Sequence, residues 1–419
     1  MSRSKVLYSG PFFDGQEIEA AISTLQEGAW YPAGKQVDRF ERAFSKQFGF
    51  TSSLMVNSGS SANLVMIAAL KKYFQWPDGA EIIVSVVGFP TTVNPIIQNG
   101  LTPKFVDITW EDLNWDLAQV EDAITDKTVA VFSSPVLGNS YDLDRLLDIC
   151  ERHSLKYIAD NCDSLGSKWD GEYLTKHAVA ASCSFYPAHH ITTFEGGMVS
   201  SNIPEIITLA RQFAWWGRDC YCVGECNMLA NGSCGKRFDT WLPDYDVVVD
   251  HKYVFSQIGY NLKPLDLQGA VGLVQLDKFD EIHTIRRLNY QTIVNYFQDY
   301  PLEVKIVGEK LQAETSWFGV PIVCDNPKVK QMLQQHLETN GVQTRNYFAG
   351  NLLLHPAYAH LGNAKDYPNA YEVLKRVFFL GTSPALTYDD LCYVGETIHS
   401  FIVNTPIACD GYSWRFALN

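Results

Sequence analysis

The chain is organised around one stretch, Ser182-Cys183-Ser184-Phe185-Tyr186-Pro187-Ala188-His189-His190-Ile191-Thr192-Thr193-Phe194-Glu195-Gly196-Gly197-Met198. Its pattern indicates a short buried strand, then a polar turn, then a Gly-Gly pair. A second β-rich run, Met198-Val199-Ser200, follows. The stretch therefore predicts two short strands separated by a turn that carries polar and titratable side chains.

Strand–turn–helix units recur on the amino-terminal side of this stretch. Short apolar strands are expected at 54–56, 82–86, 104–108, 129–132 and 156–160. Helical periodicity is found at 14–28, 36–49, 91–99 and 142–153, and in a helix through Leu64 and Leu70. Short apolar strands that alternate with helices indicate an α/β domain with a mostly parallel sheet.

The alternation stops in the segment 211–253, which is rich in Cys, Gly, Asn and Asp. We interpret this segment as a long functional loop. From about 264 a helix is expected to run through Leu273, Leu276 and Phe279. It leads into a smaller α+β unit that ends near 404. We therefore predict a large cofactor-binding domain at 1–285 and a small carboxy-terminal domain at 286–419.

Composition narrows the class of protein. The 419 residues are 46% hydrophobic and 19% charged, which is typical of a globular chain. A net charge of −14, with no basic block, argues against nucleic-acid binding. There is no run of about 20 apolar residues and no apolar core near the start, so neither a membrane span nor a secretory signal is expected. Together with ten cysteines, this predicts a cytoplasmic protein in a reducing compartment.

Three features suggest a cofactor site when taken singly, and each also has a plain structural explanation. The turn Asn57-Ser58-Gly59-Ser60-Ser61-Ala62 would hold a phosphate at a helix start, or would serve only as a helix cap. Asp160 ends an apolar strand and would accept from a pyridinium nitrogen, or cap a turn. Phe89 would stack on a ring, or pack in the core.

The order of these features along the chain resembles that of the DegT/DnrJ/EryC1/StrS sugar aminotransferases. The matching runs are Ser58–Ala62, Phe89–Thr92, Ala159–Gly166, Ser184–His189 and Gly259–Lys263. The resemblance implies the type I aminotransferase fold, a vitamin B6 cofactor and a homodimer with a shared active site. It also implies that Gly59, Ser60 and Ser184 hold the cofactor phosphate, that Phe89 stacks, and that Asp160 meets the ring nitrogen. Asp163 would lie near the ring hydroxyl, and Asn261 would reach the phosphate of the neighbouring subunit.

One departure from the family pattern bears on the reaction. The position of the Schiff-base lysine holds His189, and an imidazole moves protons but does not anchor an aldehyde as an imine. The cofactor would then bind noncovalently as pyridoxamine 5′-phosphate (PMP) rather than as anchored pyridoxal phosphate (PLP). His189 would remove the C4′ proton while the C3 hydroxyl of a 4-keto sugar leaves. The alternative is a hydrogen-bonded core histidine.

The cysteines resemble those of a narrower group, the CDP-4-dehydro-6-deoxyglucose 3-dehydrases, in which four of them hold a [2Fe–2S] cluster. The matching residues here are Cys162, Cys220, Cys222 and Cys234, with 57 residues between the first two. Eleven residues lie between Cys222 and Cys234, where that group has seven, so Cys226 is a second choice for the fourth ligand. Zinc would use the same ligands, and a set of buried thiols would need no metal.

These resemblances imply a nucleotide-sugar 3-dehydrase of 3,6-dideoxyhexose and lipopolysaccharide biosynthesis. An NADH-dependent flavin iron–sulfur reductase would supply its electrons. One alternative is a 3-dehydratase without the cluster, similar to the GDP-4-keto-6-deoxymannose 3-dehydratases. Another is a non-catalytic protein that binds a cofactor or a sugar and is stabilised by zinc. The sequence leaves open whether the nucleotide is CDP, TDP or GDP, and whether Arg345 meets its phosphate or forms a surface ion pair.

Overall fold

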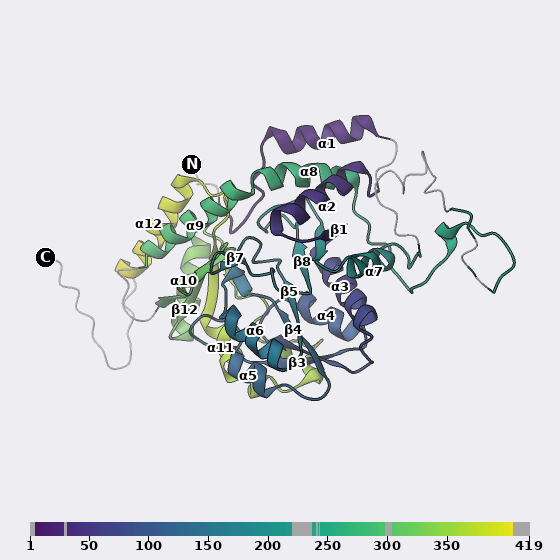
Figure 1. The fold of residues 1–419 in the computed structure, drawn as a ribbon. Helices are drawn as coiled ribbons and strands as arrows, with labels where there is room; N and C mark the ends of the chain where they lie inside the picture. The colour runs from purple at the N-terminus through teal and green to yellow at the C-terminus, as the bar shows by residue number, and fades with distance from the viewer. Residues whose placement is uncertain are drawn as a thin grey trace.

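A mixed sheet flanked by helices forms the centre of the molecule (Figure 1). The computed structural model describes residues 5–28, 32–219, 237–239, 242, 244–297 and 304–404. Within these residues the main sheet has seven strands in the order β1-β9-β8-β5-β4-β2-β3. They are β1 (Ser52–Val56), β2 (Glu81–Ser85), β3 (Thr102–Val106), β4 (Thr128–Ser133), β5 (Lys156–Asp160), β8 (Ala180–Ser184) and β9 (Gly197–Ser201).

The sheet is mostly parallel, as predicted, and β9 is the exception. Strands β3, β2, β4, β5 and β8 run parallel, whereas β9 pairs antiparallel with both β8 and β1. The chain between β8 and β9 contains no helix, whereas the crossover that joins two parallel strands is usually an α-helix. Strands β8 and β9 therefore form one antiparallel pair, with the turn that carries His189 between them.

Helices cover the sheet in two groups. Helix α3 packs on α4 and α7, and α8 packs on α1 and α2. The helices of the large unit are α1 (Gly15–Glu27), α2 (Lys35–Phe48), α3 (Gly59–Phe74), α4 (Pro90–Gln98), α5 (Leu117–Asp122), α6 (Leu143–Arg152), α7 (Pro204–Ala214) and α8 (Asp266–Asp277). Local chemistry fixes several starts, since Asp14 and Glu17 form a capping box on α1 and Pro90 opens α4.

A second, antiparallel sheet in the order β10-β12-β14-β13 forms the smaller α+β unit. Figure 1 places α10 and α12 beside it, on the side of the molecule away from α3 and α4. Its elements are β10 (Val304–Ile306), β12 (Gly319–Cys324), β13 (Arg345–Asn346), β14 (Val377–Gly381), α9 (Phe279–Asn295), α10 (Pro327–Thr339), α11 (Pro368–Arg376) and α12 (Tyr388–Asn404). A small third sheet joins β6 (Lys168–Trp169), β7 (Glu172–Tyr173) and β11 (Ala313–Glu314).

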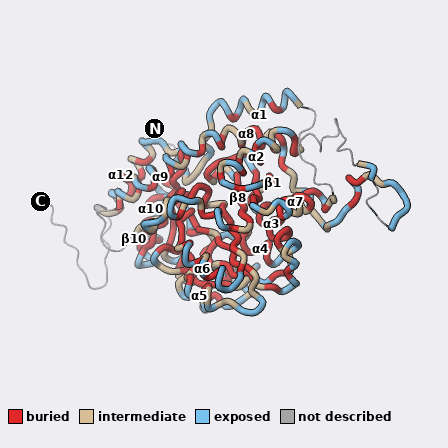
Figure 2. The backbone as a smooth tube through the Cα atoms, viewed as in Figure 1, coloured by how far each residue is buried: buried red, intermediate tan, exposed pale blue. Residues whose placement is uncertain are grey.

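Two expectations about elements need correction. Helix α7 continues to Ala214, so the segment expected to be a loop from 211 begins with a helical turn. The helix expected from 264 through Phe279 is two helices, α8 and α9, divided at Lys278. Helix α1 is largely exposed, as its mostly pale blue colour in Figure 2 shows, and its exposed residues include Ile18, Ile22 and Leu25. The domain boundary predicted near 286 falls inside α9 and stays a prediction.

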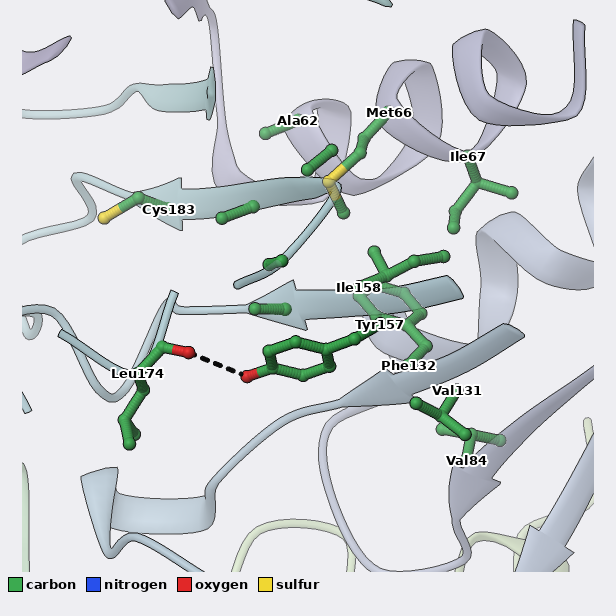
Figure 3. Packing of buried hydrophobic residues seen from close by; sticks show 14 of the residues in the cluster. Ala62, Met66, Ile67, Val84, Val131, Phe132, Tyr157, Ile158, Leu174 and Cys183 are labelled. Atoms are coloured by element: carbon green, nitrogen blue, oxygen red, sulfur yellow. Dashed lines mark hydrogen bonds between the residues drawn. The ribbon is translucent and has the colours of Figure 1, made fainter. Parts of the chain in front are cut away.

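The core lies between the main sheet and its helices. Figure 3 shows Met66 of α3 on one side of β5 and β8, and Phe132 and Val131 in the neighbouring β4. The hydroxyl of Tyr157, buried in β5, donates to the carbonyl of Leu174 at 3.1 Å. Among the described residues, no helix combines the length and apolar character that crossing a bilayer requires. This packed core fixes the strand ends that carry the polar side chains described next.

Candidate active site

A cavity of about 350 Å³ lies at the carboxyl ends of β5 and β8, where the two units meet. Residues from three regions contribute to its wall. The large unit supplies most of them, the amino-terminal segment supplies Tyr8, and the small unit supplies two phenylalanines. The lining residues are Tyr8, Ser58, Gly59, Ser60, Phe89, Thr91, Ser134, Asp160, Cys162, Asp163, Ser184, Tyr186, Ala188, His189, Glu195, Phe318 and Phe348.

One end of the cavity is formed by the start of α3. The Ser58 hydroxyl caps the helix by accepting from the Ser61 N–H at 3.1 Å. A Cβ atom on Gly59 would lie 2.5 Å from the Ser184 Cβ, so the absence of a side chain lets the helix start approach β8. Gly59, Ser60 and Ser184 are thereby brought together in the cavity wall, and their binding of a phosphate stays a prediction. A helix start with free N–H groups and hydroxyls is suited to bind a phosphate.

Asp160 is held at the end of β5 by three donors. Its Oδ2 accepts from Asn63 Nδ2 at 2.8 Å and from Thr92 Oγ1 at 2.7 Å. Its Oδ1 accepts from the Cys162 N–H at 3.2 Å. Asn63 is itself held by the Ser182 hydroxyl. The sequence indicated Asp160 but missed Asn63 and Thr92, which lie on α3 and α4 and are joined to it only by the fold.

His189 projects into the cavity beside Asp163. Its Nδ1 lies 3.6 Å from Asp163 Oδ1, beyond hydrogen-bond distance, and has no hydrogen-bond partner within the described residues. Burial, together with the positive charge of Arg286, lowers the pKa of His189 to about 3. Burial and the charge of Asp160 raise the pKa of Asp163 to about 7, against opposing effects of the Leu137 N–H and Arg286. The imidazole is therefore neutral at neutral pH.

The neighbouring His190 points elsewhere. Its Nε2 lies 2.7 Å from the Ser316 carbonyl oxygen, and it does not line the cavity. Burial, followed by the charge of Arg286, lowers the pKa of His190 well below its usual value. These contacts indicate a structural role for His190. Among the described residues that line the cavity, His189 is the one with a basic side chain.

Aromatic rings form another part of the cavity wall, which includes Phe89, Phe318 and Phe348. Phe89 is 53% exposed, and its ring centroid lies 6.1 Å from that of Phe348. Phe318 lies 5.3 Å from the His189 ring. Sequence reasoning indicated Phe89 and missed Phe348 and Phe318, which come from the small unit. The positive φ of 44° at Phe348 has no signal in the sequence, because glycine is the usual residue there.

Two predicted residues lie away from this cavity. Asn261 is exposed, accepts from the Lys263 ammonium, and is absent from the cavity lining of its own chain. Lys263 lies over the Trp216 ring at 3.2 Å. Arg345 is also exposed, but its guanidinium stacks on Tyr8 at 4.0 Å, next to the cavity wall.

Of the predicted metal ligands, Cys162 lies in the cavity wall. Burial and the charge of Asp160 raise the pKa of its thiol well above the usual value. Cys220, Cys222, Cys234 and the alternative Cys226 lie outside the described residues. Within the part of the chain that the structure describes, no three His, Cys, Asp or Glu side chains are placed to hold a metal ion.

Comparison with known proteins gives close relatives over nearly the whole chain. Lipopolysaccharide biosynthesis protein RfbH of Salmonella typhimurium is 34% identical, covering 94% of this chain and 91% of the relative. A dTDP-4-dehydro-2,6-dideoxy-D-glucose 3-dehydratase of Saccharopolyspora spinosa is 36% identical, covering 95% and 86%.

Solved structures agree with the fold. The E. coli GDP-4-keto-6-deoxy-D-mannose-3-dehydratase with bound hydrated PLP matches with a TM-score of 0.82 and 28% identity. The match covers 94% of this chain and all of that one. The aminotransferase fold expected from the sequence is thus confirmed. Since the family model spans residues 13–399, the chain belongs to the DegT/DnrJ/EryC1/StrS aminotransferase family.

Proposed function

We propose that this chain is a PMP-dependent nucleotide-sugar 3-dehydratase that removes the C3 hydroxyl of a nucleotide-linked 4-keto-6-deoxyhexose. The observation that carries the proposal is the imidazole of His189 in the cavity, at the position of the family's lysine. No lysine is among the described residues that line this cavity. An aldehyde cofactor would therefore find no amine to anchor it. The 3-dehydratase names of the S. spinosa and E. coli relatives support the same reaction.

The cavity fits a pyridoxamine phosphate in shape and in chemistry. The start of α3, with Gly59 and Ser60, would bind the phosphate together with Ser184, because a Cβ on Gly59 would fill that place. Asp160 would accept from the ring nitrogen, and Phe89 would stack on the ring. Asp163 would lie near the ring hydroxyl. When bound, PMP supplies the amine that condenses with the 4-keto group and the ring that draws electrons from it.

His189 is the proposed base for the C4′ proton. Because its pKa is lowered, the imidazole is neutral, and one nitrogen of a neutral imidazole can accept a proton, as a general base requires. Binding of an anionic phosphate and substrate adds negative charge to the cavity. This charge favours the protonated imidazole and raises the pKa of His189 toward the range of an efficient base. His189 would thus accept the proton while the leaving C3 hydroxyl departs.

Exchange of the C4′ protons of bound PMP with solvent deuterium tests this role. We expect His189→Asn to lower the exchange rate by about 100-fold or more and to leave PMP binding nearly unchanged. The matched control is His177→Asn, because His177 is half exposed and lies outside the cavity. Unchanged exchange in His189→Asn would reject His189 as the base.

We also propose that Cys162, Cys220, Cys222 and Cys234 hold a [2Fe–2S] cluster. The support is the sequence pattern together with the place of Cys162, whose N–H donates to the same Asp160 that would meet the cofactor ring. A cluster there would supply single electrons from a flavin iron–sulfur reductase. Metal analysis and EPR of anaerobically purified, dithionite-reduced protein test this, with two irons per chain and a one-electron signal as the expected result. Zinc or no metal would contradict it.

A homodimer is proposed from the place of Asn261. Because this side chain is exposed and outside its own cavity, a phosphate contact requires a second copy of the chain. The exposed apolar side chains of α1, Ile18, Ile22 and Leu25, offer a surface for such a copy. Light scattering on the purified protein is expected to give twice the mass of one chain, and a monomer that binds PMP tightly would contradict the proposal.

For the substrate we propose CDP-4-dehydro-6-deoxyglucose, in agreement with the cysteine pattern. A GDP-linked sugar without a cluster is the second candidate, favoured by the structural match to the E. coli enzyme. Incubation with CDP-, dTDP- and GDP-linked 4-keto-6-deoxyhexoses, with PMP, separates the two. Loss of the C3 hydroxyl from the CDP sugar, sustained only when reductase is present, is the expected result. Turnover of the GDP sugar without reductase would favour the second candidate.

A further inference from the structure

The guanidinium of Arg286 is buried directly behind the turn that carries His189. Arg286 belongs to α9 and is only 1% exposed. Its Nη2 donates to the His189 carbonyl oxygen at 2.8 Å and to the Ala188 carbonyl oxygen at 3.3 Å. Its Nη1 donates to the Trp317 carbonyl oxygen at 3.3 Å. One side chain therefore joins the backbone of the proposed base to the segment that leads into β12.

No carboxylate lies within ion-pair distance of Arg286 among the described residues, and its Nε has no hydrogen-bond partner there. The next residue behaves differently. Arg287 pairs with Glu309 at 3.0 Å and is about one-third exposed. Burial of a charge without an ion-pair partner destabilises the fold unless the surroundings stabilise that charge. Carbonyl oxygens, the face of the Phe318 ring at 5.9 Å and the more distant charge of Asp163 surround Arg286 in place of an ion pair. The buried place of Arg286 therefore calls for an explanation that Arg287 does not need.

The turn itself is held from several sides. The His189 N–H donates to the Tyr186 carbonyl oxygen at 2.9 Å, and the Ser9 hydroxyl donates to the Ala188 carbonyl oxygen at 3.0 Å. Arg286 binds the same Ala188 oxygen and the next one along. Rotation of the peptide units on either side of the His189 Cα would break these contacts. The backbone that aims the imidazole into the cavity is thus fixed by a side chain that does not line the cavity.

We propose that Arg286 is a positioning residue that holds the backbone of His189 so that its imidazole faces the reacting carbon. This inference rests on the proposed function, since it takes His189 as the base. Arg286 is not among the residues that line the cavity in which cofactor and substrate would bind. A misplacement of the base by about 1 Å is enough to lower a rate on the order of 100-fold.

Arg286→Met, Arg286→Lys and the control Arg287→Met test the proposal in three measurements. The first uses protein without cofactor and follows carbethoxylation of His189 by peptide mass spectrometry, with His177 as internal reference. The second is PMP affinity from absorbance, and the third is C4′ proton exchange. We expect Arg286→Met to modify His189 several-fold faster, to exchange on the order of 10- to 100-fold more slowly, and to bind PMP within about threefold of the parent. Arg286→Lys should bring both the modification rate and the exchange rate part of the way back to the parent values, because an ammonium still donates to carbonyls. Arg287→Met should match the parent.

Two results would overturn the inference. One is an Arg286→Met protein whose His189 reactivity and exchange rate equal those of the parent. The other is a protein that loses exchange, PMP binding and helical content in proportion, and that Arg286→Lys does not rescue, since this makes Arg286 a residue of general stability. Failure of the proposed function looks different, because the unmodified protein itself would then show no C4′ exchange. If the parent shows C4′ exchange, His189→Asn loses it and Arg286→Met keeps it, then His189 remains the base. In that case only the positioning role of Arg286 is rejected.

Discussion

The protonation state of the cavity is set by single residues. Burial pushes the pKa of His189 down to about 3 and the pKa of Asp163 up to about 7, although their side chains lie 3.6 Å apart. In each case burial disfavours the charged form. The positive charge of Arg286 adds to the shift of His189 and opposes that of Asp163. A neutral imidazole therefore lies beside a carboxyl group that is partly protonated at neutral pH.

The lowered pKa of His189 predicts how stability changes with pH. In the unfolded chain His189 gains a proton near pH 6.5, but in the folded protein only near pH 3. As the pH falls from about 7 to about 5, the unfolded chain binds this proton first, so wild type loses stability relative to His189→Asn. We expect the free energy of unfolding of wild type to fall by about 1–2 kcal/mol relative to that of His189→Asn. The range extends down to the lower figure because 16% of the side chain is exposed, and solvent screening there reduces the effect. Urea unfolding midpoints at several pH values measure it, and parallel pH profiles would contradict it.

Close packing at Gly59 gives a second prediction. A methyl group there would meet Ser184 at 2.5 Å, so Gly59→Ala should displace the start of α3 from β8. We expect at least about a 10-fold weaker affinity for PMP, because the N–H groups of the helix start move with it. The control is Gly15→Ala, since a Cβ on Gly15, also at a helix start, meets nothing within 4 Å. Equal PMP affinity in the two variants would show that the start of α3 does not hold the phosphate.

The sequence singled out residues of the cavity lining that follow strands and missed residues that approach from elsewhere. Asp160 and Ser184 end strands of one sheet, so their meeting at its carboxyl edge could be expected. Arg286 lies inside α9 beside a second arginine, and nothing in the local pattern separates the two. Phe318 and Phe348 belong to the small unit, and their approach to Phe89 depends on how the two units pack.

Among the elements, α2, α7 and β1 are tied by one buried ion pair. Glu41 of α2 accepts from Arg211 of α7 at 2.8 Å, and its other oxygen accepts from the Met55 N–H of β1 at 2.8 Å. Burial raises the pKa of Glu41, although Arg211 opposes the shift. Two helices and an edge strand are thus joined by a pair of charges whose side chains are less than a tenth exposed.

Removal of one partner should be costly. We expect Arg211→Met to lower the free energy of unfolding by about 3–5 kcal/mol, because it leaves the Glu41 carboxylate buried and unpaired. The double variant Glu41→Gln with Arg211→Met should recover part of the loss, since no unpaired charge remains. Thermal unfolding of the three proteins measures this. A double variant less stable than Arg211→Met would contradict the explanation.

Element types could be predicted from periodicity, and orientations and breaks could not. The strands and helices that were predicted in the large unit lie close to their expected bounds, because apolar runs and caps are local signals. Helices α5 and α7 and strands β6 and β7 were not predicted. The reversal of β9 follows from a helix-free connection, and the short apolar run itself carries no direction. The break at Lys278 accompanies ion pairs with Asp14 and Glu17, which are distant in the chain.

At the scale of the whole molecule, an acidic protein leaves an apolar strip on its surface. Ile18, Ile22 and Leu25 of α1 are 57%, 47% and 50% exposed, while the net charge is −14. The periodicity of these residues predicted the helix, but α1 packs on α8 with its other side. The spacing of apolar residues along a helix predicts which face is apolar. It does not predict whether that face packs on the same chain or on another one.

This strip predicts a change in oligomeric state. We expect the double variant Ile18→Asp with Ile22→Asp to halve the mass measured by light scattering, because two charges would be buried in the proposed dimer contact. PMP affinity should fall with it, since Asn261 of the second copy would be lost. The control is Leu311→Asp, because Leu311 is 99% exposed and far from α1 in sequence. Equal masses for parent and double variant would place the dimer contact elsewhere.

The amino-terminal segment has a practical consequence. A Cβ on Gly381 would overlap the Tyr8 carbonyl oxygen, so the backbone of this segment packs closely on β14. Tyr8 also lines the cavity described above. An affinity tag fused to the amino terminus would be attached only a few residues before Tyr8, and therefore close to the cavity. Kinetic work on such a fusion should begin with cleavage of the tag, and titrations before and after cleavage would reveal any obstruction.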